Sequence, residues 1–215
     1  MQNGINAIIF DLDGVIVHTD KYHYKAWKLL ADRLGLYFDE SVNNRLRGVS
    51  RMESLEIILE NSDYARLSEN EKTALADEKN EKYKEFLQSM TPEELSGEVY
   101  DTLNALRERG YRLAIGSSSR NARLILDKIG LGGFFDAISD GNNIINSKPD
   151  PEVFLKAAEF LSAKPEECAV VEDADAGITA AHRAGMKAAA IGDAVRYGNG
   201  DWNLDNFAAL ADIFK

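Results

Sequence analysis

Two aspartates at the end of an apolar run are the residues of this chain best placed to do chemistry. The run Ala7–Phe10 leads directly into Asp11, and Asp13 and Gly14 follow within the same short stretch. Side chains alternate along an extended chain, so Asp11 and Asp13 point the same way, and Gly14 lets the backbone turn away sharply after them. One carboxylate could attack while the other moves protons. The pair therefore predicts a site of phosphoryl transfer.

Asp11 and Asp13 also have a plainer interpretation, because aspartates commonly form turns at strand ends. For an isolated Asp-x-Asp-Gly sequence neither interpretation is favoured. Distant polar residues favour the chemical one: Ser117 and the pair Glu172 and Asp173 each follow another apolar run, and Lys148 lies between them.

Strands are the elements that must position these residues. Short apolar runs of strand character lie near residues 6–10, 112–116, 135–139, 168–172 and 187–191. Helical patterns separate the last four runs. Alternating strands and helices form a parallel, doubly wound sheet, and ligands gather at the carboxyl ends of its strands. We therefore predict an α/β fold with the polar residues at one edge of the sheet.

A long insertion separates the first two predicted strands. It has no strand-like run, and its helical patterns include residues 22–34, 54–59 and 69–87. We expect an all-helical cap, so that the predicted domains are a core of residues 1–15 and 95–215 and a cap of residues 16–94. The connections at residues 15–19 and 89–97 are candidate hinges for opening and closing. Residues 203–215 are expected to form a last helix.

The composition limits the partners of this chain of 215 residues. Its formal charge is −11, and Lys and Arg are not clustered, which argues against nucleic acid or an anionic membrane as a partner. The one cysteine, Cys168, excludes an internal disulfide and is expected to be a small buried residue in a reducing compartment. Neither a leader segment nor a run approaching ~20 apolar residues occurs. We expect a soluble, cytoplasmic protein.

The order of these pieces resembles the haloacid dehalogenase superfamily of phosphotransferases. The match spans the predicted core, and the residues that carry it are Asp11-Leu-Asp-Gly-Val15, Ser117, Lys148 and Glu172-Asp173. The resemblance implies a Rossmann-like core, a phosphoryl group carried on Asp11, and Asp13 as acid and base. Dehalogenases of the superfamily lack the second aspartate, so Asp13 favours a phosphotransferase. The resemblance also implies Mg2+, held by Asp11, the backbone carbonyl of Asp13, Glu172 and Asp173.

For Ser117 and Lys148 the resemblance implies contacts with the transferring phosphoryl group. Ser117 would hydrogen-bond this group, helped by backbone N–H groups at the next helix start, and Lys148 would supply a positive charge to it and to Asp11. Each residue has a plainer interpretation: Ser117 as a helix cap, Lys148 as a solvated loop residue, and Glu172-Asp173 as a helix N-cap. The Lys148–Pro149 bond could be trans, as most such bonds are, or cis.

A finer resemblance lies in the insertion. Its motifs, with one core loop, are similar to those of sugar-phosphate mutases in the superfamily, and they read Thr19–Trp27, Leu46–Arg51, Lys79-Asn80 and Gly116–Asn121. Those enzymes interconvert β-D-glucose 1-phosphate and D-glucose 6-phosphate, with β-glucose 1,6-bisphosphate as the priming phosphoryl donor. The residues that this resemblance assigns to substrate binding are Thr19, His23, Trp27, Gly48, Val49, Ser50, Arg51, Lys79, Ser118, Ser119, Arg120 and Asn121.

Within this set the resemblance implies distinct roles. A second phosphate requires a second anion site, for which the candidates are Arg51, Ser119, Arg120 and Asn121. Gly48 and Val49 would lie against the sugar, Lys79 would reach its hydroxyls, and His23 would help to place Asp13. His23 and Trp27 also fit a packed helix face, and Arg51 a helix surface.

Two other functions remain open. A phosphatase for small sugar phosphates could use the same core residues, because it differs from a mutase in admitting water to the phosphorylated aspartate. The second is a binding protein that has kept the fold but lost the activity. The presence of proposed catalytic and metal-binding residues argues against it, and these are Asp11, Asp13, Ser117, Lys148 and Asp173. In each case the expected partners are small sugar phosphates, and we expect a monomer because a hinged cap must move freely.

Overall fold

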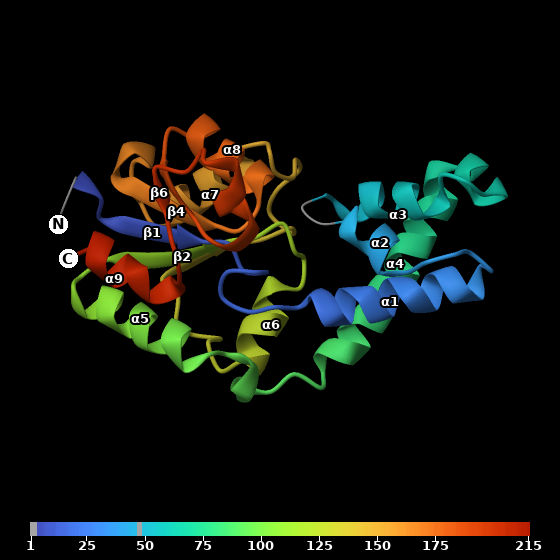
Figure 1. The fold of residues 1–215 in the computed structure, drawn as a ribbon, viewed down its shortest axis with the longest axis horizontal. Coiled ribbons are helices and arrows are strands. Elements are labelled where there is room, and N and C mark those ends of the chain that lie inside the picture. The colour runs from blue at the N-terminus through green and yellow to red at the C-terminus, as the bar shows by residue number, and fades with distance from the viewer. Residues whose placement is uncertain (1–3, 47–48) are drawn as a thin grey trace. The chain divides into compact units, whose positions relative to one another are not determined.

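The computed structural model describes residues 4–46 and 49–215 (Figure 1), and its contacts divide the chain into two compact units. The sheet unit comprises Met1–His18 and Thr91–Lys215, and the helical unit comprises Thr19–Met90. Because two stretches far apart in the sequence build the sheet unit, the helical unit is an insertion in it. No helix among the residues that the structure describes is long and apolar enough to span a membrane.

A parallel sheet forms the centre of the sheet unit. Within the described residues it has six strands in the order β3-β2-β1-β4-β5-β6. They are β1 (Ala7–Phe10), β2 (Arg112–Gly116), β3 (Ala137–Ser139), β4 (Cys168–Glu172), β5 (Lys187–Ala190) and β6 (Trp202–Asn203). All the ladders between them are parallel. Strands β1 to β5 lie within the predicted apolar runs, which confirms the doubly wound α/β fold.

The register brings the carboxyl ends of the central strands to one level. Phe10, the last residue of β1, lies beside Ile115 of β2 and Val171 of β4. Asp11 follows directly, and its N–H donates to the carbonyl of Val171 at 3.0 Å. The chain therefore leaves β1 between the ends of two neighbouring strands, where polar residues from all three can meet.

Helices cover both faces of the sheet. They are α5 (Gly97–Glu108), α6 (Ala122–Lys128), α7 (Glu152–Phe160), α8 (Asp175–Arg183) and α9 (Leu210–Ile213). Figure 1 shows α7 and α8 on one face and α5 and α9 on the other. Alternate residues of β1 serve the two faces: Ile9 packs in a cluster with Phe154 of α7, whereas the ring of Phe10 stacks on Phe207 with centroids 5.8 Å apart.

The C-terminal segment differs from the predicted helix over residues 203–215. Asn203 belongs to β6 and lies beside Ala190 of β5, and the side chain of Asn206 caps a short 3-10 turn, Phe207–Ala209, before α9. Leu204, Phe207, Leu210 and Phe214 are all buried. Their spacing mimics a helical period, but the pairing of β6 holds the first part extended. Other 3-10 turns span Pro92–Glu94, Pro165–Glu167 and Gly192–Tyr197.

The described residues of the helical unit form helices joined by turns and loops. They are α1 (Asp20–Arg33), α2 (Glu40–Asn44), α3 (Arg51–Leu59), the 3-10 turn Asp63–Arg66 and α4 (Glu69–Leu87). Apolar residues of α1, α3 and α4, among them Trp27, Leu55 and Ala76, share one buried cluster. Ser50 and Ser68 begin α3 and α4 with reciprocal capping boxes. The short, polar helix α2 was not predicted.

The observed boundaries of the two units lie inside the predicted cap of residues 16–94. Residues 16–18 and 91–94 belong to the sheet unit instead. The reason at the first boundary is local: the N–H groups of Ile16 and Val17 donate to the carbonyl of Leu12, and both side chains are buried. The turn after β1 therefore closes on itself before the chain enters α1.

Candidate active site

The turn after β1 carries Asp11 and Asp13. Gly14 adopts a φ of +87°, and its N–H donates to the carbonyl of Val17 at 2.8 Å. Only glycine adopts such a backbone readily. A Cβ at Gly14 would also lie 2.1 Å from the Oδ2 atom of Asp173, so the absent side chain leaves room for that carboxylate. Gly14 therefore makes room for the carboxylate of Asp173 beside the turn that carries Asp11 and Asp13.

Lys148 joins Asp11 to Glu172. Its ammonium donates hydrogen bonds to Asp11 Oδ1 and, at 2.6 Å, to Glu172 Oε1. The exposed fractions of the three side chains are 9% for Lys148, 11% for Asp11 and 2% for Glu172. Lys148 is therefore not a solvated loop residue but the central cation of a buried array. The Lys148–Pro149 bond, which the sequence left open, is cis.

Burial, with a smaller effect of neighbouring carboxylates, raises the pKa values of the aspartates in this array. Burial raises the pKa of Asp11 to about 7, and Glu172 and Asp13 add to the effect while Lys148 opposes it. Burial, with Glu172 and Asp11, raises the pKa of Asp173 to about 8. Burial lowers the pKa of Lys148, but Asp11 and Glu172 outweigh it and hold that pKa above its usual value. The array thus holds more negative charge than Lys148 neutralises.

The chemistry of the donor set fits a hard divalent cation. Asp11, Glu172 and Asp173 are oxygen donors, and their excess negative charge favours a metal such as Mg2+. Glu172, however, directs its oxygens to Lys148 and, at 2.8 Å, to the N–H of Ala174. Across residues 4–46 and 49–215 no three carboxylate, histidine or cysteine side chains converge as a metal-binding group. The set fits Mg2+ by its chemistry, with Glu172 placed as the partner of Lys148.

Neither Glu172 nor Asp173 is the N-cap residue of the next helix, but Glu172 still bonds the start of that helix. Helix α8 begins after Ala174, and Glu172 accepts a hydrogen bond from the N–H of that residue. A Cβ at Gly177 would lie 1.9 Å from Glu172 Oε1, so glycine there leaves space for the carboxylate. Glu172 therefore supports the helix start and the lysine at once.

A loop of serines follows β2 at the same edge. The N–H of Ser117 donates to the carbonyl of Ser139 at 3.0 Å, and Ser117 Oγ accepts from the N–H of Ser119 at 3.1 Å. Ser119 Oγ accepts in turn from the N–H of Asn121 at 3.2 Å. Helix α6 begins only after Asn121, so Ser117 caps the loop and not the helix. Ser117 and Asn121 are buried, Ser118 and Ser119 are half-buried, and Arg120 is exposed.

A second loop, which the sequence did not single out, supports the serines. Asn142 Nδ2 donates to the carbonyl of Arg120 at 3.0 Å, and the N–H of Gly141 donates to the carbonyl of Ser119 at 3.2 Å. A Cβ at Gly141 would lie 2.4 Å from the carbonyl oxygen of Ser118. The asparagine and glycine pair in Asp140-Gly-Asn-Asn143 is typical of turns, but its packing on the serine loop carries no sequence signal.

In the helical unit, Lys79 contacts other residues that were predicted to bind the substrate. Its ammonium lies 2.9 Å from His23 Nδ1 and 4.5 Å from the centroid of the Trp27 ring. Lys79 and Trp27 are each 3% exposed. Burial, Lys79 and the charge of Arg51 lower the pKa of His23 well below its usual value, so His23 is neutral. Lys79, His23 and Trp27 therefore form one cationic and aromatic cluster.

The remaining predicted residues of this unit lie on α3 and before it. Arg51 donates to Asn80 Oδ1 at 2.9 Å and lies 3.7 Å from Asp77 Oδ1. Ser50 caps α3, and Val49 is exposed. Gly48 lies outside the described residues. Arg51 is therefore half-buried and held by α4, which differs from a simple surface position.

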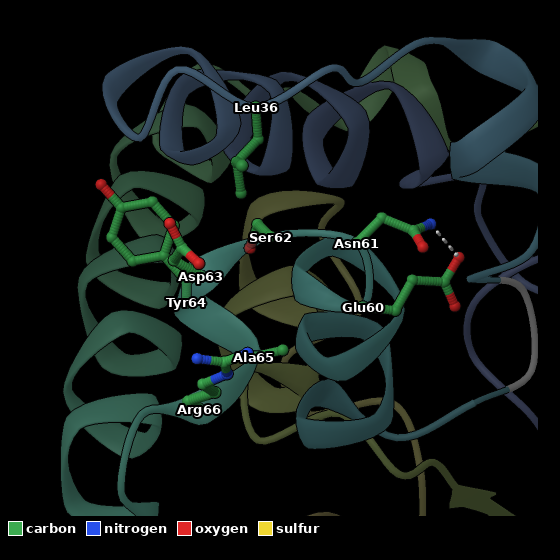
Figure 2. Close-up of a pocket in the computed structure, with 8 residues that line it drawn as sticks. All are labelled: Leu36, Glu60, Asn61, Ser62, Asp63, Tyr64, Ala65 and Arg66. Carbon is green, nitrogen blue, oxygen red and sulfur yellow. Dashed lines mark hydrogen bonds between the residues drawn. The ribbon is translucent and has the colours of Figure 1, made fainter.

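The predicted residues thus form two groups, one in each unit. Asp11, Asp13, Ser117, Lys148, Glu172, Asp173 and the serine loop belong to the sheet unit, and Thr19 and the residues from His23 to Lys79 belong to the helical unit. A hollow of about 600 Å3 in the helical unit is a separate feature, lined by Leu36 and residues 60–66. Figure 2 shows it with Asn61 donating to Glu60. Its lining residues are not those predicted to bind the substrate.

The chain is similar to known proteins along most of its length. A family model of haloacid dehalogenase-like hydrolases matches residues 5–185. β-Phosphoglucomutase from Bacillus subtilis (strain 168) is 41% identical over 189 residues, which cover 87% of this chain and 84% of that protein. A phosphorylated carbohydrates phosphatase from Thermotoga maritima is 31% identical, covering 85% and 83%. The crystal structure of β-phosphoglucomutase from Clostridium difficile is 37% identical with a TM-score of 0.88, covering 96% and 93%.

Proposed function

The chain belongs to the haloacid dehalogenase-like hydrolase family, and we propose that it is a phosphotransferase that isomerises β-D-glucose 1-phosphate to D-glucose 6-phosphate. The observation that carries the proposal is the buried contact of Asp11 with Lys148 at the strand end that also bears Asp13. The similarity to two β-phosphoglucomutases over most of the chain supports the choice of substrate.

In this proposal Asp11 is the nucleophile. Its carboxylate oxygen forms a bond to phosphorus as the bond between phosphorus and the sugar oxygen breaks, and Asp13 gives a proton to that oxygen. In the second half, Asp13 takes a proton from the attacking sugar hydroxyl as the phosphoryl group leaves Asp11. The bisphosphate, β-glucose 1,6-bisphosphate, is both the intermediate and the priming phosphoryl donor.

Fixed charges and dipoles support the transfer. Lys148 neutralises charge on the phosphoryl oxygens and orients Asp11. The hydroxyl of Ser117, whose oxygen accepts from the N–H of Ser119, donates to the same phosphoryl oxygens. We propose that Asp11, Asp173 and the carbonyl of Asp13 hold Mg2+, and that Glu172, which was also predicted as a ligand, supports the array through its bond with Lys148. When bound, Mg2+ would offset the repulsion between the carboxylate and the phosphate.

For the helical unit the proposal assigns substrate recognition. Lys79 would contact sugar hydroxyls, and Arg51 with Ser119, Arg120 and Asn121 would bind the phosphate that is not being transferred. The cationic character of the cluster around Lys79 supports an anionic sugar as its ligand. Arg51→Ala is expected to weaken use of the bisphosphate far more than hydrolysis of a small acyl phosphate, and equal losses would count against this role.

The second candidate function is a sugar-phosphate phosphatase, which the Thermotoga maritima relative favours. One assay separates the two. The protein is incubated with Mg2+, β-glucose 1-phosphate and a trace of glucose 1,6-bisphosphate, and glucose 6-phosphate and free phosphate are followed in the same tube. Mostly glucose 6-phosphate supports the mutase, whereas free phosphate as the main product overturns it in favour of the phosphatase.

We further propose that the enzyme works as a monomer in the cytoplasm, on small sugar phosphates and without a nucleic acid or membrane partner. The charge of −11 supports the last point, because anionic polymers and surfaces repel such a protein. Sedimentation of the purified protein tests the monomer.

A further inference from the structure

We propose that Tyr83 is a positioning residue that holds Lys79 and His23 in the arrangement with which they contact the substrate. The inference rests on the proposed function, which assigns both residues to substrate binding. Tyr83 lies on α4 one helical turn after Lys79, and it is 1% exposed. The sequence did not single it out.

Tyr83 contacts three of the predicted residues at once. Its ring centroid lies 4.0 Å from that of His23, with 32° between the planes. The ammonium of Lys79 lies 4.7 Å from the same centroid. The hydroxyl of Tyr83 donates to Thr19 Oγ1 at 3.2 Å. The tyrosine therefore forms a common wall for the cluster.

The ring face suits this task because it attracts a cation without neutralising it. An ammonium over an aromatic face keeps its charge and its ability to donate, whereas a carboxylate in contact with it would cancel the charge. Lys79 lies over the faces of both Trp27 and Tyr83 and beside His23 Nδ1. Tyr83 thus holds the ammonium of Lys79 close to His23.

The position of Lys79 against Tyr83 also determines which nitrogen of His23 carries the proton. The Nδ1 atom of His23 faces the ammonium of Lys79, so it accepts and the ring proton resides on Nε2. The charges that face His23 are those of Lys79 on α4 and Arg51 on α3, and together with burial they disfavour a second ring proton. Without the tyrosine ring, the side chains of Lys79 and His23 can move apart. His23 then no longer has to stay neutral with its proton on Nε2.

The test compares Tyr83→Leu with Tyr83→Phe. Leucine removes the ring face, and we expect the KM for β-glucose 1-phosphate to rise about tenfold or more, with the imidazole pKa of His23 shifting upward in an NMR titration. Phenylalanine keeps the face and loses the hydroxyl contact with Thr19, so a rise of about two- to fivefold in KM is expected. Hydrolysis of a small acyl phosphate, which needs the sheet unit, is the activity control. Tyr24→Leu, which removes a ring packed against Phe38 in the same unit, is the structural control.

The NMR titration separates this inference from the proposed function. If the wild type does not turn over the sugar phosphate, the proposed function fails, and the titration still decides whether Tyr83 positions the pair. An unchanged His23 titration in Tyr83→Leu, or an equal change in Tyr24→Leu, overturns the inference. A folded Tyr83→Leu with a shifted titration and an unchanged KM overturns it as well, because the arrangement would then be irrelevant to the substrate.

Discussion

Lys148 donates a hydrogen bond to the carboxylate of Asp11, although 137 residues separate the two in sequence. The same ammonium bonds Glu172, so one lysine ties the loop before α7 to the ends of β1 and β4. This contact sets both the charge and the direction of the proposed nucleophile.

Replacing Lys148 by methionine should lower kcat by about 100-fold or more, because the phosphoryl oxygens and Asp11 lose their fixed cation. The free energy of unfolding should fall by about 3 kcal/mol, since the two buried carboxylates of Asp11 and Glu172 lose the cation that they share. Steady-state kinetics and urea unfolding measure both. Lys156→Met is the control, because Lys156 pairs with Glu159 at the surface and its loss should be nearly neutral. Equal effects of the two substitutions would contradict the assignment.

Gly14→Ala should displace Asp173 and lower kcat by at least about tenfold, because the new Cβ meets Asp173 Oδ2 at 2.1 Å. Gly110→Ala is a matched control: φ is +86° at Gly110, and apart from its two chain neighbours no described residue has an atom within 4 Å of a Cβ there. Backbone strain alone should therefore destabilise Gly110→Ala by about 1–2 kcal/mol without affecting kcat. Similar kinetics for the two variants would show that Gly14 serves the backbone alone.

His23 should make the protein less stable in mild acid. Its pKa in the folded protein lies below the ordinary value of 6.5, so the unfolded chain binds the proton first as the pH falls. The contribution of His23 to the free energy of unfolding should therefore decline from about pH 7 downward. This contribution is measured by urea unfolding of the wild type and of His23→Gln at a series of pH values. It is the difference between their free energies of unfolding at each pH. The same difference for His182→Gln, in the sheet unit, is the control, and a His23 difference that is constant with pH would refute the prediction.

A chelator should abolish activity, and added Mg2+ should restore it, if the carboxylate array holds the metal. Asp173→Asn should raise the Mg2+ concentration for half-maximal activity by about tenfold or more. Asp175→Asn is the control, because Asp175 lies just beyond the array and accepts a hydrogen bond from Asn199. Full activity in excess chelator would exclude the proposed metal site.

Much of the sheet unit could be predicted from the sequence, because its strands are continuous apolar runs. Parallel strands end at a common edge, which is why Asp11, Ser117 and Glu172 could be expected together. The contact of Lys148 with Glu172 and the cis bond before Pro149 could not be predicted from the sequence. Both involve a loop, where no hydrophobic periodicity indicates the direction of a side chain or the path of the backbone.

The helical unit was harder to predict in detail. Helices α1 and α4 are long, whereas α2 is short and polar and depends on its cap at Asp39. Tyr83 has the sequence signature of a core residue, and only its contacts with His23 and Lys79 distinguish it. The prediction of a helix over residues 203–215 was wrong because Leu204 and Phe207 are buried at a helical spacing, although the chain there is not an α-helix.

The most direct test of the account follows the phosphoryl group on Asp11. The enzyme is labelled with a radioactive phosphoryl donor, freed of excess donor, and chased with β-glucose 1-phosphate, with Asp11→Asn as the control. We expect the wild type to take up label and to pass it to the sugar as glucose 1,6-bisphosphate, while Asp11→Asn takes up none. Label on the Asn variant, or release of the label from the wild type mainly as free phosphate during the chase, would contradict it.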